Sequence, residues 1–193
     1  MEHLKHCLAC GSDRYRPYVQ TAAMMHAKSD VVYNFDRCDE CGLVFLNPRV
    51  KASELGQFYT ADYLPYRVQQ AWGRYANFVE GDQKRIDSER VRRVMAHCRV
   101  QPKSRILDVG CGKPTFLAAL RAVTKTQLIG LDFSDEGWAG EPEKFDKLDL
   151  RKGEIADLLT EAPMDVITMW HYLEHDYAPK AHLQQLLKLA HPE

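Results

Sequence analysis

The chain has 193 residues, enough for one ordinary domain or for an incomplete domain with a small metal-stabilised module, but not for two large domains. Hydrophobic residues make up 45% and charged residues 27% of it, which is typical of a globular protein and argues against disorder. The 26 basic and 27 acidic side chains give a net charge of -1 at pH 7, so the chain as a whole has no attraction for nucleic acid or an anionic membrane.

Residues 1–50 combine paired cysteines with two short β-prone runs, at 31–35 and 43–46, and close at Asn47-Pro48. Runs of this kind, bounded by turn residues, predict a small β module. The start of the chain lacks the apolar run of a signal peptide, and nowhere do the roughly 20 apolar residues of a membrane span follow one another. We therefore expect a cytoplasmic protein without a membrane segment.

Four cysteines form two Cys-x-x-Cys pairs, which are Cys7 with Cys10 and Cys38 with Cys41. At this spacing a tight turn directs both sulfurs at one point, and two such turns complete a tetrahedral shell of soft thiolates that favours zinc. Gly11 and Gly42 follow the pairs and can take the positive φ that lets the backbone approach a metal. Because no coordination position stays open, the predicted Zn²⁺ is structural. Four unrelated thiols or a redox pair are the alternatives, although neither pair opens a helix as a redox motif does.

Residues 51–100 predict connecting helices, because apolar residues recur there at helical spacing, as at Ile86, Val91 and Val94. The mixed-charge run at 84–93 is typical of a solvated helix face. Four tyrosines could form a lid over an acceptor pocket or pack as ordinary aromatic residues: Tyr59, Tyr63, Tyr66 and Tyr75.

From residue 101 to residue 193, short apolar runs alternate with amphipathic stretches. The predicted strands are 105–109, 128–132, 144–148 and 165–170, and the predicted helices are 116–123, 153–161 and 179–190. Alternation of strand and helix predicts an α/β fold with a parallel, Rossmann-like sheet.

The first of these strands ends in Asp108-Val109-Gly110-Cys111-Gly112 and feeds a helix that begins near Thr115. Glycines let a ligand approach the backbone, and a helix N-terminus presents N–H groups to a negative group, so a nucleotide-like cofactor is expected. A dinucleotide fingerprint needs glycine at position 115, and its pyrophosphate disfavours a carboxylate at position 108. An ammonium group, as in the amino acid part of S-adenosylmethionine, suits that carboxylate.

Acids recur at the ends of the next two predicted strands. Asp132, about 20 residues beyond the glycines, is placed to accept hydrogen bonds from ribose hydroxyls. Asp149 follows the third run and is expected to meet the adenine edge. Because the carboxyl ends of parallel strands form the ligand edge of an open α/β sheet, we expect these acids to share one site with Asp108.

These motifs resemble those of class I S-adenosylmethionine-dependent methyltransferases. Asp108 to Gly112 is similar to the first motif of that family, residues 131–134 to the second, and residues 165–175 to the fourth strand with its loop. The cysteine pairs and the following residues 42–48 resemble the zinc-binding segment that precedes this domain in many bacterial members. Some of those act in deoxysugar or cell-surface polysaccharide pathways, and the catalytic half is similar to ubiquinone-pathway O-methyltransferases.

The resemblance implies that the sheet binds S-adenosylmethionine. The glycine loop with Asp108 would surround the methionine part, Asp132 would bind the ribose, and Asp149 with Leu150 would bind the adenine. Trp170 and His171 would border the sulfonium. The predicted cofactor-binding residues are Asp108, Gly110, Cys111, Gly112, Asp132, Phe133, Asp149, Leu150 and Trp170.

Two features depart from the family pattern. Pro114 stands where a third glycine is common, which stiffens the loop. The chain stops at Glu193, where family members continue into a fifth strand, a helix and an antiparallel pair, so the strand with Val166 and Ile167 would be a sheet edge. We expect either a truncated chain or a homo-oligomer that covers this edge.

Methyl transfer to a hydroxyl or an acidic carbon needs a base, and histidine as a residue type titrates near neutral pH. His175 and His171 are the candidate catalytic bases, although Glu174 and His175 could instead fix the loop by hydrogen bonds. The predicted function is methyl transfer from S-adenosylmethionine to a small-molecule acceptor such as a sugar, a quinone precursor or another metabolite. One alternative is a non-catalytic zinc-ribbon and Rossmann-like binding or assembly module. A nucleic-acid-binding zinc protein is the weaker alternative, because the cysteine region lacks a dense basic surface with interleaved aromatic residues.

Overall fold

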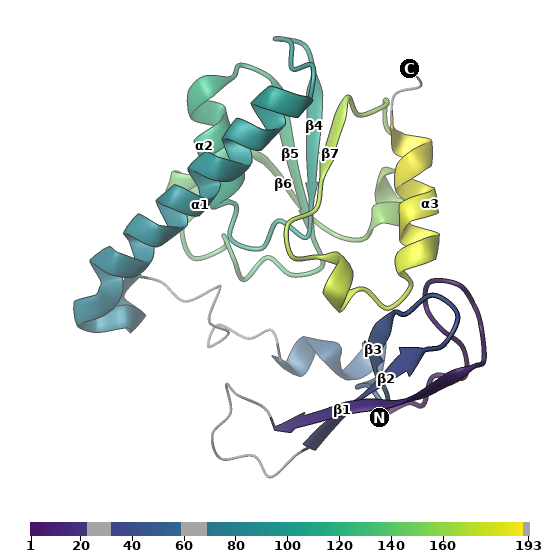
Figure 1. The fold of residues 1–193 in the computed structure, drawn as a ribbon. Coiled ribbons are helices and arrows are strands. Elements are labelled where there is room, and N and C mark those ends of the chain that lie inside the picture. Colours follow the sequence, from purple (N-terminus) through teal and green to yellow (C-terminus); the bar gives the residue numbers. More distant parts are fainter. Residues whose placement is uncertain (23–31, 59–68, 191–193) are drawn as a thin grey trace. The chain divides into compact units, whose positions relative to one another are not determined.

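The computed structural model describes residues 1–22, 32–58 and 69–190, and Figure 1 shows them as a ribbon. Three of the predicted lid residues, Tyr59, Tyr63 and Tyr66, lie outside these ranges. Within the described residues, no helix is both long enough and apolar enough to cross a bilayer.

The chain divides into two compact units. The first contains Met1–Gln57 together with Tyr177–Ala181, and the second contains Phe58–Asp176 together with His182–Glu193. The predicted connector at 51–100 is divided between the two units, because residues 51–57 belong to the first unit and the described residues from 58 to 100 belong to the second.

The first unit is built on a three-stranded antiparallel sheet, which confirms the predicted β module. Its strands are β1 (Tyr15–Ala22), β2 (Val32–Cys38) and β3 (Val44–Leu46), in the order β1-β2-β3, and the 3₁₀ helix η1 (Ala52–Phe58) follows them. A small core forms where the ring of Tyr15 meets Phe45 edge-on, with centroids 5.5 Å apart. The buried Cys7 and Cys38 complete this core.

Residues 177–181 are held in the first unit by Tyr177. Its hydroxyl donates a hydrogen bond of 2.7 Å to the carbonyl of Val50, and the guanidinium of Arg49 lies 4.1 Å from the centre of its ring. A cation above an aromatic face is an attractive contact. These contacts explain why a segment so late in the chain groups with the N-terminal sheet.

The second unit is an open parallel sheet with helices on both faces, as Figure 1 shows. The strands are β4 (Arg105–Val109), β5 (Gln127–Asp132), β6 (Asp149–Lys152) and β7 (Val166–Thr168), in the order β6-β5-β4-β7. The helices are α1 (Ala76–His97), α2 (Thr115–Val123) and α3 (Pro179–Leu189), which belongs to this unit from His182 onward. The 3₁₀ helices are η3 (Gln69–Tyr75), η4 (Pro142–Lys144), η5 (Ile155–Leu158) and η6 (Leu173–His175). Strand order and parallel pairing give the Rossmann-like fold that the sequence predicted.

Successive side chains of the central strands point to opposite faces of the sheet, so both faces carry apolar side chains. On β4, Ile106 packs with α1 and α2, whereas Leu107 and Val109 pack with η5 and α3 on the other face. Both faces are covered, so the strands are almost continuously apolar, as expected of a buried parallel sheet.

Two predicted elements were misplaced. The strand predicted at 144–148 is wrong, because η4 and a turn occupy that stretch and β6 runs over Asp149–Lys152. Phe145 is buried and supplied the apolar signal, but it packs from a turn rather than from a strand. The helix predicted at 153–161 is only the 3₁₀ helix η5. Among the described residues, β7 pairs on one side only, with β4, which agrees with the predicted edge.

Candidate functional site

The glycine loop lies between β4 and α2, at the carboxyl end of the sheet. Gly110 has φ +69° and Gly112 has φ +50°, values in the left-handed region that side chains disfavour. The loop is also tightly enclosed. A Cβ at Gly110 would lie 2.4 Å from Cδ2 of Tyr172, and a Cβ at Gly137 would lie 2.2 Å from the carbonyl oxygen of Gly112.

Asp132 joins the end of β5 to this loop. One carboxylate oxygen accepts a hydrogen bond of 2.9 Å from the backbone N–H of Gly112, and the other accepts one of 3.1 Å from the N–H of Ser134. The side chain is buried, and burial raises the pKa of Asp132 although these N–H groups oppose the rise. The structure therefore brings together two elements that the sequence assigned to one cofactor.

Asp108, the last residue but one of β4, is fully enclosed. Its Oδ1 accepts a hydrogen bond of 2.7 Å from the hydroxyl of Thr168 on β7. Burial raises the pKa of Asp108 to about 7, against the opposing effects of the Thr168 hydrogen bond and the positive charge of Arg90. The negative charges of Asp87 and Asp132 raise that pKa further, so Arg90, Asp87 and Asp132 all lie close enough to act on Asp108.

Three side chains of α1 reach this site, and the sequence analysis missed all of them. Gln83 donates through Nε2 to both carboxylate oxygens of Asp87, at 3.1 Å each, and lies 3.3 Å from the hydroxyl of Thr115. Nη1 of Arg90 lies 3.5 Å from Oδ1 of Asp87, and its Cζ lies 5.2 Å from the centre of the Trp170 ring. Positions 83, 87 and 90 share one face of a helix.

The prediction of a solvated face for residues 84–93 is therefore wrong at Asp87, which is only 3% exposed. It is correct for charged neighbours such as Arg85 and Arg92, whose side chains are exposed. A signal was present in the sequence, because Asp87 precedes Val91 and Val94 by four and seven residues and so shares their buried stripe.

The loop after β7 carries Trp170 and both predicted bases. The Trp170 ring meets Phe116 edge-on at 5.4 Å, and its indole N–H is buried without a hydrogen-bond partner among the described residues. His171 is exposed, has a left-handed φ of 55°, and places Nδ1 3.2 Å from Oε1 of Glu174. His175 is exposed at the end of η6. The alternative role predicted for Glu174 and His175 was to fix the loop by hydrogen bonds, and Glu174 makes such a contact with His171.

Tyr172 and Asp176, two other residues of the segment after β7, make contacts that were not predicted. The ring of Tyr172 is half-buried against Gly110, and burial raises the pKa of Tyr172 to about 12, with the charges of Asp176 and Asp132 adding to the effect. Nδ1 of His182, on α3, lies 2.8 Å from the buried carboxylate of Asp176.

Asp149 and Leu150 do not lie where the adenine prediction needs them. Asp149 begins β6 and is paired with Ile129, whereas Lys152 at the other end of the strand is paired with Asp132. The carboxylate of Asp149 receives two hydrogen bonds from Arg151, at 3.0 and 2.7 Å. Leu150 packs in the apolar layer beside α2. The prediction assumed that Asp149 follows the end of a strand at 144–148. In the structure Asp149 is instead the first residue of β6, so its side chain does not lie at the carboxyl end of the sheet.

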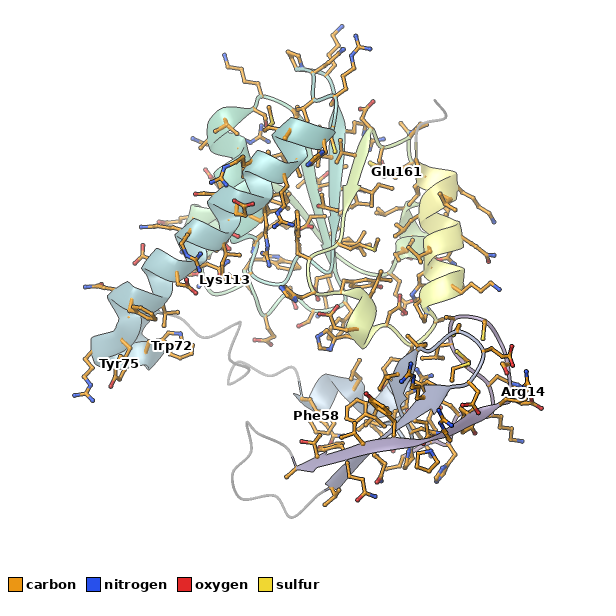
Figure 2. The ribbon with its side chains drawn as sticks, viewed as in Figure 1. Arg14, Phe58, Trp72, Tyr75, Lys113 and Glu161 are labelled. Carbon is orange, nitrogen blue, oxygen red and sulfur yellow. The ribbon has the colours of Figure 1, made fainter. Side chains whose placement is uncertain are left out.

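An ion-pair network explains where the Asp149 side chain is held. Arg151 also contacts Glu161, which in turn pairs with Arg105 at the first position of β4. Glu161 is labelled in Figure 2. Arg105 is the first residue of β4, so this network lies at the amino ends of the strands, whereas the glycine loop lies at their carboxyl ends.

The remaining predicted cofactor residues surround the loop. Cys111 is buried, burial raises the pKa of its thiol well above the ordinary value, and its backbone N–H bonds to the carbonyl of Leu131. Phe133 follows Asp132 and is 45% exposed. Lys113 was not among the predicted cofactor residues; it is labelled in Figure 2 and forms an ion pair of 2.6 Å with Glu141.

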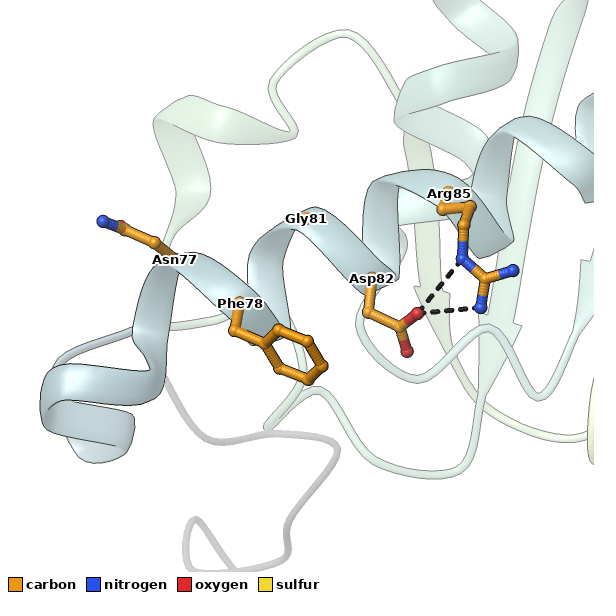
Figure 3. Close-up of a pocket in the computed structure, with 5 residues that line it drawn as sticks. All are labelled: Asn77, Phe78, Gly81, Asp82 and Arg85. Carbon is orange, nitrogen blue, oxygen red and sulfur yellow. Dashed lines mark hydrogen bonds and ion pairs between the residues drawn. The ribbon is translucent and has the colours of Figure 1, made fainter.

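A separate hollow of about 400 Å³ opens beside the start of α1 (Figure 3). Its lining residues are Asn77, Phe78, Gly81, Asp82 and Arg85, and Asp82 pairs with Arg85 across it. None of them belongs to the glycine loop or to the carboxyl ends of the strands, so this hollow is not assigned to the cofactor.

The second candidate site is the cysteine cluster of the first unit. The four sulfurs of Cys7, Cys10, Cys38 and Cys41 all lie within 4.8 Å of one another. The closest separations are 3.5 Å between Cys7 and Cys41 and 3.6 Å between Cys10 and Cys38. Four sulfurs bound to one zinc at about 2.3 Å would be roughly 3.8 Å apart, so this donor set fits a tetrahedral metal.

The two turns that carry these sulfurs are built alike. The N–H of Gly11 bonds to the carbonyl of Cys7 at 2.9 Å, and the N–H of Gly42 bonds to the carbonyl of Cys38 at 3.0 Å. Both glycines have positive φ, +79° and +75°, as predicted. The backbone N–H of Cys41 lowers the pKa of Cys38, which favours the thiolate that a metal requires.

Together, a parallel α/β sheet and a glycine loop joined to an acidic strand end define the Rossmann-like class of nucleotide-binding folds. A family described as a methyltransferase domain matches residues 78–193, which is more than half of the chain. The chain belongs to this methyltransferase-domain family.

One curated relative shares limited sequence identity with the chain. A probable S-adenosylmethionine-dependent methyltransferase of Mycolicibacterium smegmatis is 27% identical over 88 residues, which cover 45% of this chain and 34% of that protein. The chain thus spans about a third of the length of this curated relative.

Two solved structures show weaker likeness. Streptomyces venezuelae DesVI has a TM-score of 0.48 and 20% identity, over 66% of this chain and 55% of that one. A SAM-dependent methyltransferase from Geobacter sulfurreducens, in complex with S-adenosyl-L-homocysteine, has a TM-score of 0.45 and 17% identity, over 54% and 44%.

Proposed function

We propose that the chain binds S-adenosylmethionine at the carboxyl ends of β4, β5 and β7 and transfers its methyl group to a small-molecule acceptor. The observation that carries this proposal is the hydrogen bond from Gly112 to Asp132, which joins the glycine loop to the acidic end of the next strand. Membership of the methyltransferase-domain family supports it.

The amino acid part of the cofactor carries a positive ammonium and a negative carboxylate, and it needs a partner for each. Asp108 is the buried acid beside the glycine loop and suits the ammonium. Arg90 suits the carboxylate, because its charge acts on Asp108 and its guanidinium stacks on Trp170. The N–H of Trp170 is a second donor, because it is buried without a hydrogen-bond partner among the described residues.

The ribose and the base fit the next strand end. Asp132 uses one lone pair of each carboxylate oxygen on the backbone, so further lone pairs remain for ribose hydroxyls. Phe133 exposes an aromatic ring directly beside it, which suits contact with the base. We do not include Asp149 in this site, because it lies at the amino end of β6, where Arg151 holds its carboxylate.

Bound S-adenosylmethionine supplies a methyl group on a positively charged sulfur, which an acceptor displaces in line. The protein has to align the two partners and, for a hydroxyl or an acidic carbon, accept a proton. We propose His171 and His175 for that role. His171 is the better placed of the two, since it follows Trp170 and its Nδ1 is held by Glu174, which leaves Nε2 to accept a proton.

For the first unit we propose structural zinc bound by the four cysteines. All four positions of a tetrahedral ion would be filled by protein sulfurs, so this metal would take no part in the methyl transfer. Its role would be to hold two turns and a short sheet that have only a small apolar core.

Calorimetric titration of the zinc-loaded protein with S-adenosylhomocysteine tests the cofactor proposal without an acceptor. We expect micromolar binding that weakens at least tenfold in Asp132→Ala. If the wild-type protein does not bind S-adenosylhomocysteine, the proposal fails. Binding without turnover across a screen of hydroxylated and amine acceptors would favour a binding module instead.

A further inference from the structure

Asp87 is a carboxylate buried inside a helix that is otherwise rich in exposed ion pairs. Its side chain is 5% exposed, compared with 45% for Asp82, five residues earlier on α1. A buried charge is costly unless it is paired and hydrogen-bonded, so such a residue needs a physical explanation. Its partners, Gln83 and Arg90, lie on the same face of α1.

These three residues link parts of the cofactor site that lie far apart in the sequence. Gln83 connects Asp87 to Thr115, the first residue of the helix that follows the glycine loop. Arg90 connects it to Trp170, in the loop after β7. Asp87 therefore stands between the two loops that border the proposed methionine position.

The contacts that Arg90 already makes determine which of its N–H groups remain available to a ligand. The Cζ atom of Arg90 lies over the Trp170 ring, 5.2 Å from its centre, and the N–H groups of a guanidinium lie in the guanidinium plane. One of these N–H groups is directed at Asp87, at 3.5 Å. A guanidinium fixed from one side in this way offers its other donors to a carboxylate in one orientation.

We propose that Asp87 is a positioning residue, which holds Arg90 so that its guanidinium meets the carboxylate of the bound cofactor. The inference rests on the proposed function and adds to it a residue that does not touch the cofactor. Gln83 serves the same purpose by fixing Asp87 against Thr115.

The test compares two ligands on the full, zinc-loaded chain. S-adenosylhomocysteine carries the amino acid part, and 5′-methylthioadenosine lacks it. In Asp87→Asn we expect S-adenosylhomocysteine to bind about tenfold more weakly and 5′-methylthioadenosine to bind within twofold of the wild type. Asp82→Asn is the matched control, because Asp82 and Arg85 have the same spacing on the same helix but are exposed. It should change neither affinity by more than twofold.

Equal weakening of both ligands in Asp87→Asn would show a general structural defect and would overturn the inference. Unchanged affinity for S-adenosylhomocysteine would overturn it as well. A wild-type protein that binds neither ligand would refute the proposed function itself, whereas wild-type binding with an unaffected Asp87→Asn variant would refute only the positioning role.

A double-mutant cycle with Arg90→Met gives an independent readout. If Asp87 acts through Arg90, the double variant should bind S-adenosylhomocysteine no more weakly than Arg90→Met alone, and additive losses would contradict the inference. Should Asp87→Asn not fold, Gln83→Met keeps the pair of Asp87 with Arg90 and removes the contacts of Gln83 with Asp87 and Thr115. We then expect a threefold or greater loss for S-adenosylhomocysteine with 5′-methylthioadenosine unchanged, and equal effects on both ligands would overturn the proposal.

Discussion

The ring of Tyr172 lies so close to Gly110 that a single added methyl group would come within 2.4 Å of its Cδ2 atom. The loop after β7 and the glycine loop therefore fit together only if position 110 has no side chain. The φ of +69° at Gly110 imposes the same requirement for a second, independent reason.

Gly110→Ala should consequently weaken both folding and cofactor binding. The left-handed backbone alone costs about 1–2 kcal/mol for a side chain, and displacement of Tyr172 adds to that cost. We expect a lower midpoint of thermal unfolding and at least tenfold weaker binding of S-adenosylhomocysteine. Gly140→Ala is the control, because a Cβ there meets nothing within 4 Å. Equal affinity in both variants would contradict the enclosed loop.

The stability of the protein should depend on pH through Asp108. Its pKa in the folded state is about 7, above the ordinary value, so the folded protein holds a proton that the unfolded chain releases. Stability should therefore fall as pH rises from about 4 to 7, by on the order of 4 kcal/mol, and level off above. Asp108→Asn should remove this slope. Urea unfolding at several pH values would measure it, and identical slopes in the two proteins would rule the effect out.

Cofactor binding should show the opposite pH dependence. The ammonium of S-adenosylhomocysteine favours the ionised form of Asp108, so affinity should rise about tenfold between pH 6 and pH 8. Thr168→Val removes the hydrogen bond that stabilises the carboxylate and should move the rise to higher pH. Thr168→Ser should restore the wild-type profile. Calorimetry across this range would reject the assignment if the three profiles coincide.

Loss of the metal should affect the first unit before the second. We expect about one zinc per chain by elemental analysis, and its removal by a chelator should expose residues 1–57 to proteolysis while a fragment with the α/β sheet resists. Cys38→Ser should behave like the chelated protein. Cys98→Ser should behave like the wild type, because Cys98 lies outside the cluster. A metal-free protein with unchanged protease resistance would contradict the structural role.

Asp149→Ala should leave cofactor affinity within twofold of the wild type. The side chain pairs with Arg151 at the amino end of the sheet, and both groups are about a third exposed, so solvent screening should limit the loss of stability to at most about 1 kcal/mol. A tenfold loss of affinity for S-adenosylhomocysteine would restore the adenine prediction that the structure disfavours.

Those parts of the candidate site that depend on neighbouring residues in the chain could be predicted from the sequence. Gly110, Gly112 and Asp132 could be found because a tight turn and a strand end require those residue types at those positions. The start of β6 was missed because the strand itself is polar and half-buried, whereas the apolar signal at Phe145 came from a turn.

The contribution of α1 could not be predicted in the same way. Asp87 shares the apolar stripe of Val91 and Val94, but it lies within a run of charged residues whose other members, such as Arg85 and Arg92, are exposed. Its burial depends on how α1 packs beside α2 and on the position of Trp170 more than 80 residues later. Such information belongs to tertiary packing rather than to any one segment.

The contact of Arg90 with Trp170 also makes the fluorescence of this tryptophan a probe of the proposed site. Indole emission responds to a nearby charge and to the displacement of water, and this ring borders the proposed methionine position. The chain has three tryptophans, so replacing Trp72 and Trp138 with phenylalanine would leave a single emitter there. Its intensity would then follow the arrival of the cofactor in real time, at protein concentrations far below those that calorimetry needs.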